Sequence, residues 1–140
     1  MQKRFVALRE DTPGRAWLAR FNAGRSETEA WYLGEGRDEP PTPQQCRDAL
    51  RRYMPELSTP YDHVCALVGD DTRAHQVSSH YRPAPIAFGC TQAVWLGSGG
   101  PALVRNYDYP IEIVSNHFES TSWFGREVIA KGQRPWGGLP

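Results

Sequence analysis

The sequence predicts an α+β fold in which helices come first and antiparallel strands follow. Before Pro83, apolar residues recur at helical spacing and helix-start signals repeat along the chain. After Pro85, apolar residues gather in short runs that are separated by glycine-rich turns, as in β-hairpins. Segregation of helices and strands along a chain is typical of α+β proteins, whereas alternation is typical of α/β proteins.

The composition fits one globular domain of 140 residues, or part of a larger one. Sixteen basic and sixteen acidic residues cancel. A nucleic-acid groove or a membrane-surface patch needs clustered positive charge, so we expect neither partner. No apolar run approaches the roughly 18 residues of a membrane span. Three cysteines without a Cys-x-x-Cys pair, and the lack of a secretory signal, are typical of a reduced cytoplasmic protein.

One short strand and one long helix are expected first. Residues Lys3–Arg9 fit a strand. In Arg15–Leu33, aromatic and aliphatic residues recur at roughly helical spacing, although Gly24 interrupts the pattern. We expect a helix over this range, followed by a polar loop at Gly34–Pro41.

Three further helices are expected, each from a start signal. Thr42-Pro43-Gln44-Gln45 combines a capping box with Pro at the first helical position. Thr59-Pro60 repeats this signal, and Asp71 is a further N-cap residue. These three helices are expected to end at Pro55, Gly69 and Tyr81, respectively.

Two β-hairpins are expected in the second half of the chain. The first joins Phe88–Leu96 to Pro101–Tyr109 through a Gly-Ser-Gly-Gly turn, and the second joins Glu119–Phe124 to Glu127–Lys131. No terminal element follows, so we expect the sheet to be truncated. The chain accordingly divides into a mainly helical region, residues 1–89, and the start of a β-sheet domain, residues 90–140.

Cys90 is the residue best placed for chemistry, because it follows a glycine at the start of the first hairpin. A hairpin centred within its glycine-rich turn pairs Leu96 with Ala102 and Cys90 with Asp108, and Asn106 then lies on the same face. A one-residue slip in register would place a tyrosine opposite Cys90 instead. The plain alternative is that Cys90 is a small buried hydrophobe, as most free cysteines are.

Two segments near this cysteine resemble a known family. Gly89–Trp95 (GCTQAVW), the glycine-rich turn, and Leu103–Tyr109 (LVRNYDY) resemble the nucleophile region of the acyl-coenzyme A:6-aminopenicillanic acid acyltransferase-like, autoproteolytic N-terminal-nucleophile (Ntn) hydrolases. The more distant choloylglycine and penicillin V acylases have a similar Cys-Thr start and Arg-Asn-x-Asp segment. Tyr53–Leu57 (YMPEL) is similar to the region before the nucleophile. The resemblance spans most of the chain and is specific from Gly89 to Tyr109.

This resemblance implies a fold and an activity. The fold would be a four-layer αββα sandwich, of which this chain would supply a part. The activity would be that of a cysteine N-terminal-nucleophile amidohydrolase or acyltransferase on linear amide or acyl-thioester substrates, with no cofactor and no metal. We expect the 140-residue chain alone to be inactive.

The resemblance also assigns roles to individual residues. Gly89–Cys90 would be the self-cleavage bond and Cys90 the nucleophile, with Asp108, Arg105 and Asn106 as active-site partners. The α-amine freed at Cys90 has a reference pKa of roughly 7.7–8.0 and would act as general base for its own thiol. Strict strand alternation places Arg105 on the face opposite Asp108, so both would serve one site only with a bulge between them.

Histidines offer weaker alternatives. A zinc site could use His63, Cys65, His75 and His80, but residues two or five apart on a helix do not share a face well. His117 could form a dyad with Cys90, although no papain-type motif surrounds that cysteine, and a surface loop is the expected place for His117.

A second function class stays open. A catalytically silent α+β module with an unfinished sheet would expose hairpin edges, through which it could dimerise or bind a partner strand. A homo-oligomer would fit this alternative, whereas a small-molecule partner would fit the enzyme.

Overall fold

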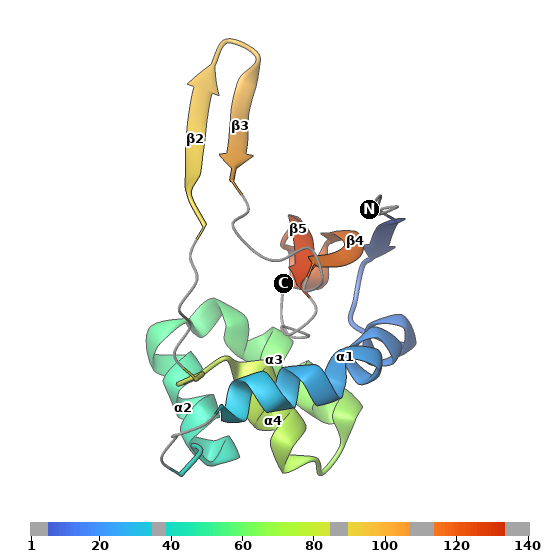
Figure 1. Cartoon of the computed structure of the whole chain (residues 1–140), viewed down its shortest axis with the longest axis vertical. Coiled ribbons are helices and arrows are strands. Elements are labelled where there is room, and N and C mark those ends of the chain that lie inside the picture. Colours follow the sequence, from blue (N-terminus) through green and yellow to red (C-terminus); the bar gives the residue numbers. More distant parts are fainter. Residues whose placement is uncertain (1–5, 35–38, 85–89, 107–113, 134–140) are drawn as a thin grey trace.

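The computed structural model of the chain describes residues 6–34, 39–84, 90–106 and 114–133 and has the expected α+β character. In Figure 1 the helices gather into one body, a small sheet lies beside them, and a hairpin extends away from both. The elements are β1 (Val6–Glu10), α1 (Arg15–Leu33), α2 (Pro43–Tyr53), the 3₁₀ helix η1 (Pro55–Leu57), α3 (Ser58–Val68), α4 (Thr72–Ser79), β2 (Gln92–Gly97), β3 (Gly100–Arg105), β4 (Val114–Thr121), the 3₁₀ helix η3 (Trp123–Gly125) and β5 (Val128–Gln133).

Local capping explains where two of the helices begin. The Gln45 N–H donates to Thr42 Oγ1 at 3.2 Å and the Thr42 N–H donates to Gln45 Oε1 at 2.8 Å, so the predicted capping box of α2 is confirmed. Asp71 caps α4, because its carboxylate accepts the Ala74 N–H at 3.0 Å. The bounds predicted for α1 agree with the structure.

Two helix boundaries differ from the prediction. Helix α3 begins at Ser58 and has no side-chain cap, because η1 leads directly into it; Thr59 lies inside its first turn. Helix α4 ends at Ser79 instead of Tyr81, because His80 adopts a left-handed backbone conformation with φ of 50°.

The sheet is mixed, whereas the sequence predicted antiparallel strands alone. Its order is β1-β4-β5. β1 runs parallel to β4, with Leu8 opposite Glu119, and β5 runs antiparallel to β4. A parallel pair needs a long connection, which the helices provide here. A strand from the start of the chain therefore shares a sheet with strands from its end.

Glu10, at the end of β1, connects the sheet to the helices. Its Oε1 accepts the Gly14 and Trp17 N–H groups at 3.3 and 3.1 Å, which are donors at the start of α1. Its Oε2 accepts Arg20 Nη2 at 2.8 Å, and Arg20 Nε lies 3.6 Å from Glu119 Oε1 on β4. The start of α1 and the strands β1 and β4 are thus held together by the Glu10 carboxylate and the Arg20 guanidinium.

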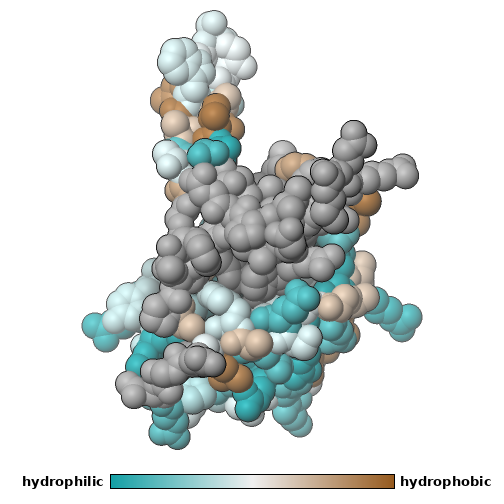
Figure 2. All heavy atoms as spheres, viewed as in Figure 1, coloured by the Kyte–Doolittle hydropathy of each residue, from teal (hydrophilic) through white to brown (hydrophobic). Residues whose placement is uncertain are grey.

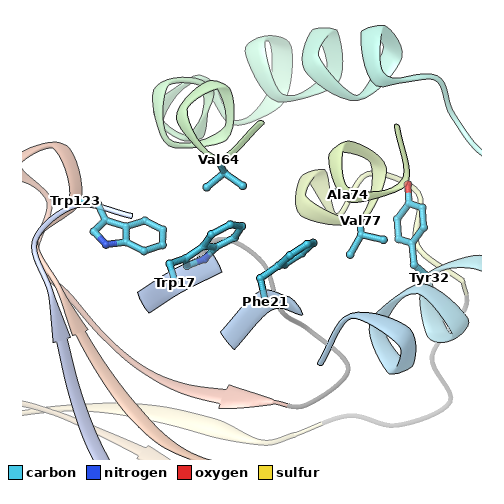
Figure 3. Packing of buried hydrophobic residues seen from close by; sticks show 7 residues of the cluster. All are labelled: Trp17, Phe21, Tyr32, Val64, Ala74, Val77 and Trp123. Atoms are coloured by element: carbon cyan, nitrogen blue, oxygen red, sulfur yellow. The ribbon is translucent and has the colours of Figure 1, made fainter. Parts of the chain in front are cut away.

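Helix α4 contacts each of the other three helices, and a hydrophobic core forms between them (Figure 3). Trp17 and Phe21 stack with ring centroids 5.0 Å apart, and Trp123 reaches the same core from the loop after β4. The members of this core are Trp17, Phe21, Tyr32, Val64, Ala74, Val77 and Trp123. Cys46, Leu50, Tyr61 and Cys65 form a second buried cluster between α2 and α3.

The chain that leaves α4 is fastened to the end of α1. The buried Tyr32 hydroxyl donates to the Tyr81 carbonyl at 2.6 Å. Ala84 packs so closely on Gly34 that a Cβ atom at Gly34 would lie 2.5 Å from the Cβ of Ala84. The His80 ring lies against Trp31, with ring centroids 6.2 Å apart. These contacts hold the segment from His80 to Ala84 against the end of α1.

We predict that Glu10→Ala lowers the free energy of unfolding by about 2 kcal/mol, because hydrogen bonds to a charged group are lost at a part-buried position. Urea denaturation followed by circular dichroism measures this loss. Glu27→Ala, at an exposed position of α1, is the control and should change stability by less than about 0.5 kcal/mol. Equal losses in the two variants would contradict the role of Glu10.

The buried imidazole of His80 makes the stability of the fold depend on pH. Its residue surface is partly exposed, but its Nε2 atom is buried and has no hydrogen-bond partner among the described residues, and burial lowers its pKa. The unfolded state therefore takes up the proton first, so we predict that the free energy of unfolding falls as the pH drops below about 6.5. His80→Asn should reduce this fall, because Asn tolerates the left-handed backbone without titrating.

Denaturation curves at pH 7 and pH 5 measure the effect. His75→Asn on the same helix, where the imidazole contacts the Gly69 carbonyl, is the matched control. A pH dependence that is unchanged in His80→Asn would refute the assignment.

Candidate functional site

The predicted site residues that the structure describes lie at the foot of the β2–β3 hairpin. The Asn106 N–H donates to the Thr91 carbonyl at 2.8 Å, which extends the pairing one step beyond the strands. Cys90 is the next residue and is half-buried. The hairpin thus brings Cys90 close in the fold to Arg105 and Asn106, which are exposed. Gly89 and Asp108 lie outside the described residues.

The register of this hairpin differs by one residue from the predicted register. Leu96 pairs with Pro101, where Ala102 was predicted, and Gly97 pairs with Gly100 across the Ser98-Gly99 turn. The turn has two residues instead of the predicted three, because Gly100 already pairs with Gly97. Its φ of 98° is a conformation that residues with side chains disfavour and glycine adopts readily. The predicted pairing of Cys90 with Asp108 therefore loses its geometric basis, since it depended on the other register.

The observed register changes the position of Arg105 relative to Cys90. Arg105 pairs with Gln92, which is two residues after Cys90. Continuing the strand alternation back from Gln92 places Cys90 and Arg105 on the same side of the hairpin. Arg105 can therefore serve a site at Cys90 without the bulge that the predicted register required. Asn106 pairs with Thr91 and so lies on the opposite side of the hairpin, which contradicts its predicted place on the same face as Cys90.

The other two cysteines are structural. Cys46 is fully buried and Cys65 is 5% exposed, both in the cluster between α2 and α3. Burial raises the pKa of the Cys65 thiol, which disfavours the reactive thiolate. All three cysteines lie in the described part of the chain, and Cys90 is the one with an accessible surface.

Two of the histidines that a zinc site could use contact backbone carbonyl groups instead. His63 Nε2 lies 2.9 Å from the Pro13 carbonyl, and His75 Nε2 lies 2.8 Å from the Gly69 carbonyl. Within the described ranges, no three His, Cys, Asp or Glu residues gather as a metal site would require. His117 lies in β4 opposite Val6, in a strand and not in the loop expected for it.

A shallow hollow of about 510 Å³ opens beside the ends of β1 and β4, and the sequence did not predict it. The Ser122 hydroxyl donates to Asp11 Oδ1 at 2.7 Å within it. The hollow depends on pairing between opposite ends of the sequence, so no local motif could have indicated it. Its lining residues are Arg9, Asp11, Ser120, Thr121, Ser122, Glu127 and Val128, which include no cysteine or histidine.

None of the helices in the described ranges combines the length and the apolar character that crossing a membrane requires. Comparison with known proteins found no matching family model, curated protein or solved structure.

We predict that a thiol reagent modifies Cys90 in the native protein and leaves Cys46 and Cys65 unmodified. Cys90 is accessible, whereas the others are buried and become reactive only on unfolding. Mass spectrometry of iodoacetamide-treated protein should show one added group in buffer and three in denaturant. Labelling of Cys46 or Cys65 at the rate of Cys90 would contradict this placement.

Proposed function

We propose that the chain carries the nucleophile region of a cysteine N-terminal-nucleophile amidohydrolase or acyltransferase that acts on linear amide or acyl-thioester substrates. The observation that supports this proposal most directly is the foot of the hairpin. There the hydrogen bond from the Asn106 N–H to the Thr91 carbonyl joins the Gly-Cys-Thr segment to the Arg-Asn segment. The resemblance noted in the sequence rests on these same two segments.

Self-cleavage at Gly89–Cys90 would prepare the nucleophile. The Cys90 thiol attacks the carbonyl carbon of Gly89, the C–N bond breaks, and the nitrogen takes the thiol proton and becomes the α-amine. Water then hydrolyses the thioester, which leaves a carboxylate on Gly89 and a free thiol on Cys90. The α-amine can afterwards accept the proton of that thiol when a substrate carbonyl is attacked.

Arg105 has the chemistry to bind an anion at this site. Its guanidinium can hold a substrate carboxylate through two parallel hydrogen bonds. Asp108, by the resemblance, would orient the ammonium form of the new N-terminus.

The described residues lack the surroundings that catalysis needs. Both strands of the hairpin that follows Cys90 are exposed on both faces, and no described helix or strand packs over them. Acyl transfer depends on donors preorganised for the oxyanion, and loss of one donor alone costs roughly 10²–10³ in rate. Strain at the Gly89–Cys90 bond would likewise need a structure that holds it.

We predict that the 140-residue chain remains uncut, and that any longer chain in which the domain is completed is cleaved between Gly89 and Cys90. Intact mass and N-terminal sequencing distinguish the two states. Cys90→Ala should abolish both cleavage and amide turnover, because it removes the attacking sulfur. Cys46→Ala, which removes a buried thiol, is the control and should leave both intact. An uncut complete chain that still hydrolyses amides would overturn the mechanism.

One observation favours the second candidate function, an interaction module without catalysis. The hairpin exposes large hydrophobic side chains on both faces, which is a surface that a partner would cover.

A further inference from the structure

Hairpin β2–β3 exposes five large hydrophobic residues, which together we call the hairpin patch. The exposed fractions are 67% for Val94, 67% for Trp95, 80% for Leu96, 64% for Leu103 and 64% for Val104. Brown apolar atoms on the projecting hairpin are visible in Figure 2. The two strands contact each other but, within the described ranges, neither packs extensively on another element. An isolated two-stranded hairpin is at best marginally stable in water, so this one needs a partner.

The composition of the hairpin patch suits a second copy of the same chain. No charged residue occurs from Gly89 to Val104, so two identical strands would bring no like charges together. Antiparallel pairing of two such strands would set the apolar side chains of the two copies side by side on each face of the joined sheet.

The two edges of the hairpin are not equivalent. Hydrogen-bonded pairs alternate along an antiparallel ladder, and the bond from Asn106 to Thr91 makes that pair a bonded one. By alternation, the pair of Leu96 with Pro101 is a non-bonded one, so the backbone groups of both residues face outward. Pro101 has no N–H to offer, so the outer edge of β3 lacks a donor next to the turn and pairs less well than the edge of β2.

The outer edge of β2 is open by the same alternation. Gln92, Val94 and Leu96 direct their N–H and C=O groups away from β3, and this strand contains no proline. When two copies of one strand pair antiparallel through such groups, the outward residues form the bonded pairs. The register with the greatest overlap then places Val94 opposite Val94, and Gln92 opposite Leu96, across a two-fold axis.

We propose that β2 pairs with β2 of a second copy of this chain in this register, which joins the two hairpins into one four-stranded antiparallel sheet. The interface is isologous, as in most homodimers, because each copy contributes the same strand. The pairing goes beyond the proposed catalytic function and does not involve the Cys90 thiol. Cys90→Ala should therefore dimerise as the unchanged chain does, so that failure of either proposal can be recognised separately.

Substitution of Val94 by residues of opposite charge tests the proposal. Sedimentation velocity at micromolar concentration should show the unchanged protein at twice the chain mass. Val94→Lys and Val94→Glu should each sediment as monomers, because the substituted residue would face its own copy. An equimolar mixture of the two variants should regain the double mass, which also shows that both variants are folded.

Val6→Lys is the matched control, because Val6 is an exposed valine, 46% exposed, on the edge strand of the other sheet. It should leave the double mass unchanged. A monomeric unchanged protein would overturn the proposal, and so would double mass in Val94→Lys alone.

Hydrogen exchange on the same samples identifies which strand edge forms the interface. The amides of Gln92, Val94 and Leu96 should exchange more slowly in the dimer than in the Val94→Lys monomer, whereas those of Leu103 and Arg105 should not change. Protection of the β3 amides instead would refute the use of β2.

Discussion

The carboxylate of Glu10 lies where β1, the start of α1 and the neighbouring strand β4 meet, and it fixes how the sheet joins the helices. It accepts two N–H groups at the start of α1 and the guanidinium of Arg20, which also approaches Glu119 on β4. The Ser122 N–H donates to the Glu10 carbonyl at 3.3 Å, so the loop after β4 is held to the same residue. With β4 so placed, Trp123 enters the helical core beside Trp17. Burial of these aromatics then contributes the larger share of the stability, because apolar area removed from water outweighs a few hydrogen bonds.

Cys90 lies between the packed body and the exposed hairpin. Before it, the Tyr32 hydroxyl holds the Tyr81 carbonyl and Ala84 rests on Gly34, so the outgoing chain is fastened to α1. After it, the Thr91–Asn106 bond closes the hairpin. The half-buried Cys90 thiol is thereby placed between a part of the chain that packs around its own core and a hairpin whose two faces are exposed.

The features that could be predicted from the sequence are those determined within a few residues. The capping box at Thr42 and the cap at Asp71 depend on side chains that reach backbone groups three positions away, and both are confirmed. The errors arise where distant or competing constraints decide. Thr59 is no cap because η1 already aligns the chain for α3. The parallel pairing of β1 with β4 joins residues more than a hundred positions apart, which no periodicity reveals. For the site, Cys90 was singled out by its neighbours in sequence, but its partners depend on a hairpin register that one glycine conformation shifts.

Pro101 has a consequence for how far assembly can proceed. Exposed, uncharged strands of this composition are ordinarily the seeds of cross-β fibrils, because each added strand presents a fresh edge to the next. In the proposed dimer, pairing between the two β2 strands uses the open edge of both hairpins. Each outer strand of the joined sheet is then a β3 strand that contains Pro101. Addition of a third chain to this sheet is therefore disfavoured, and β2 can pair with a second copy without open-ended polymerisation.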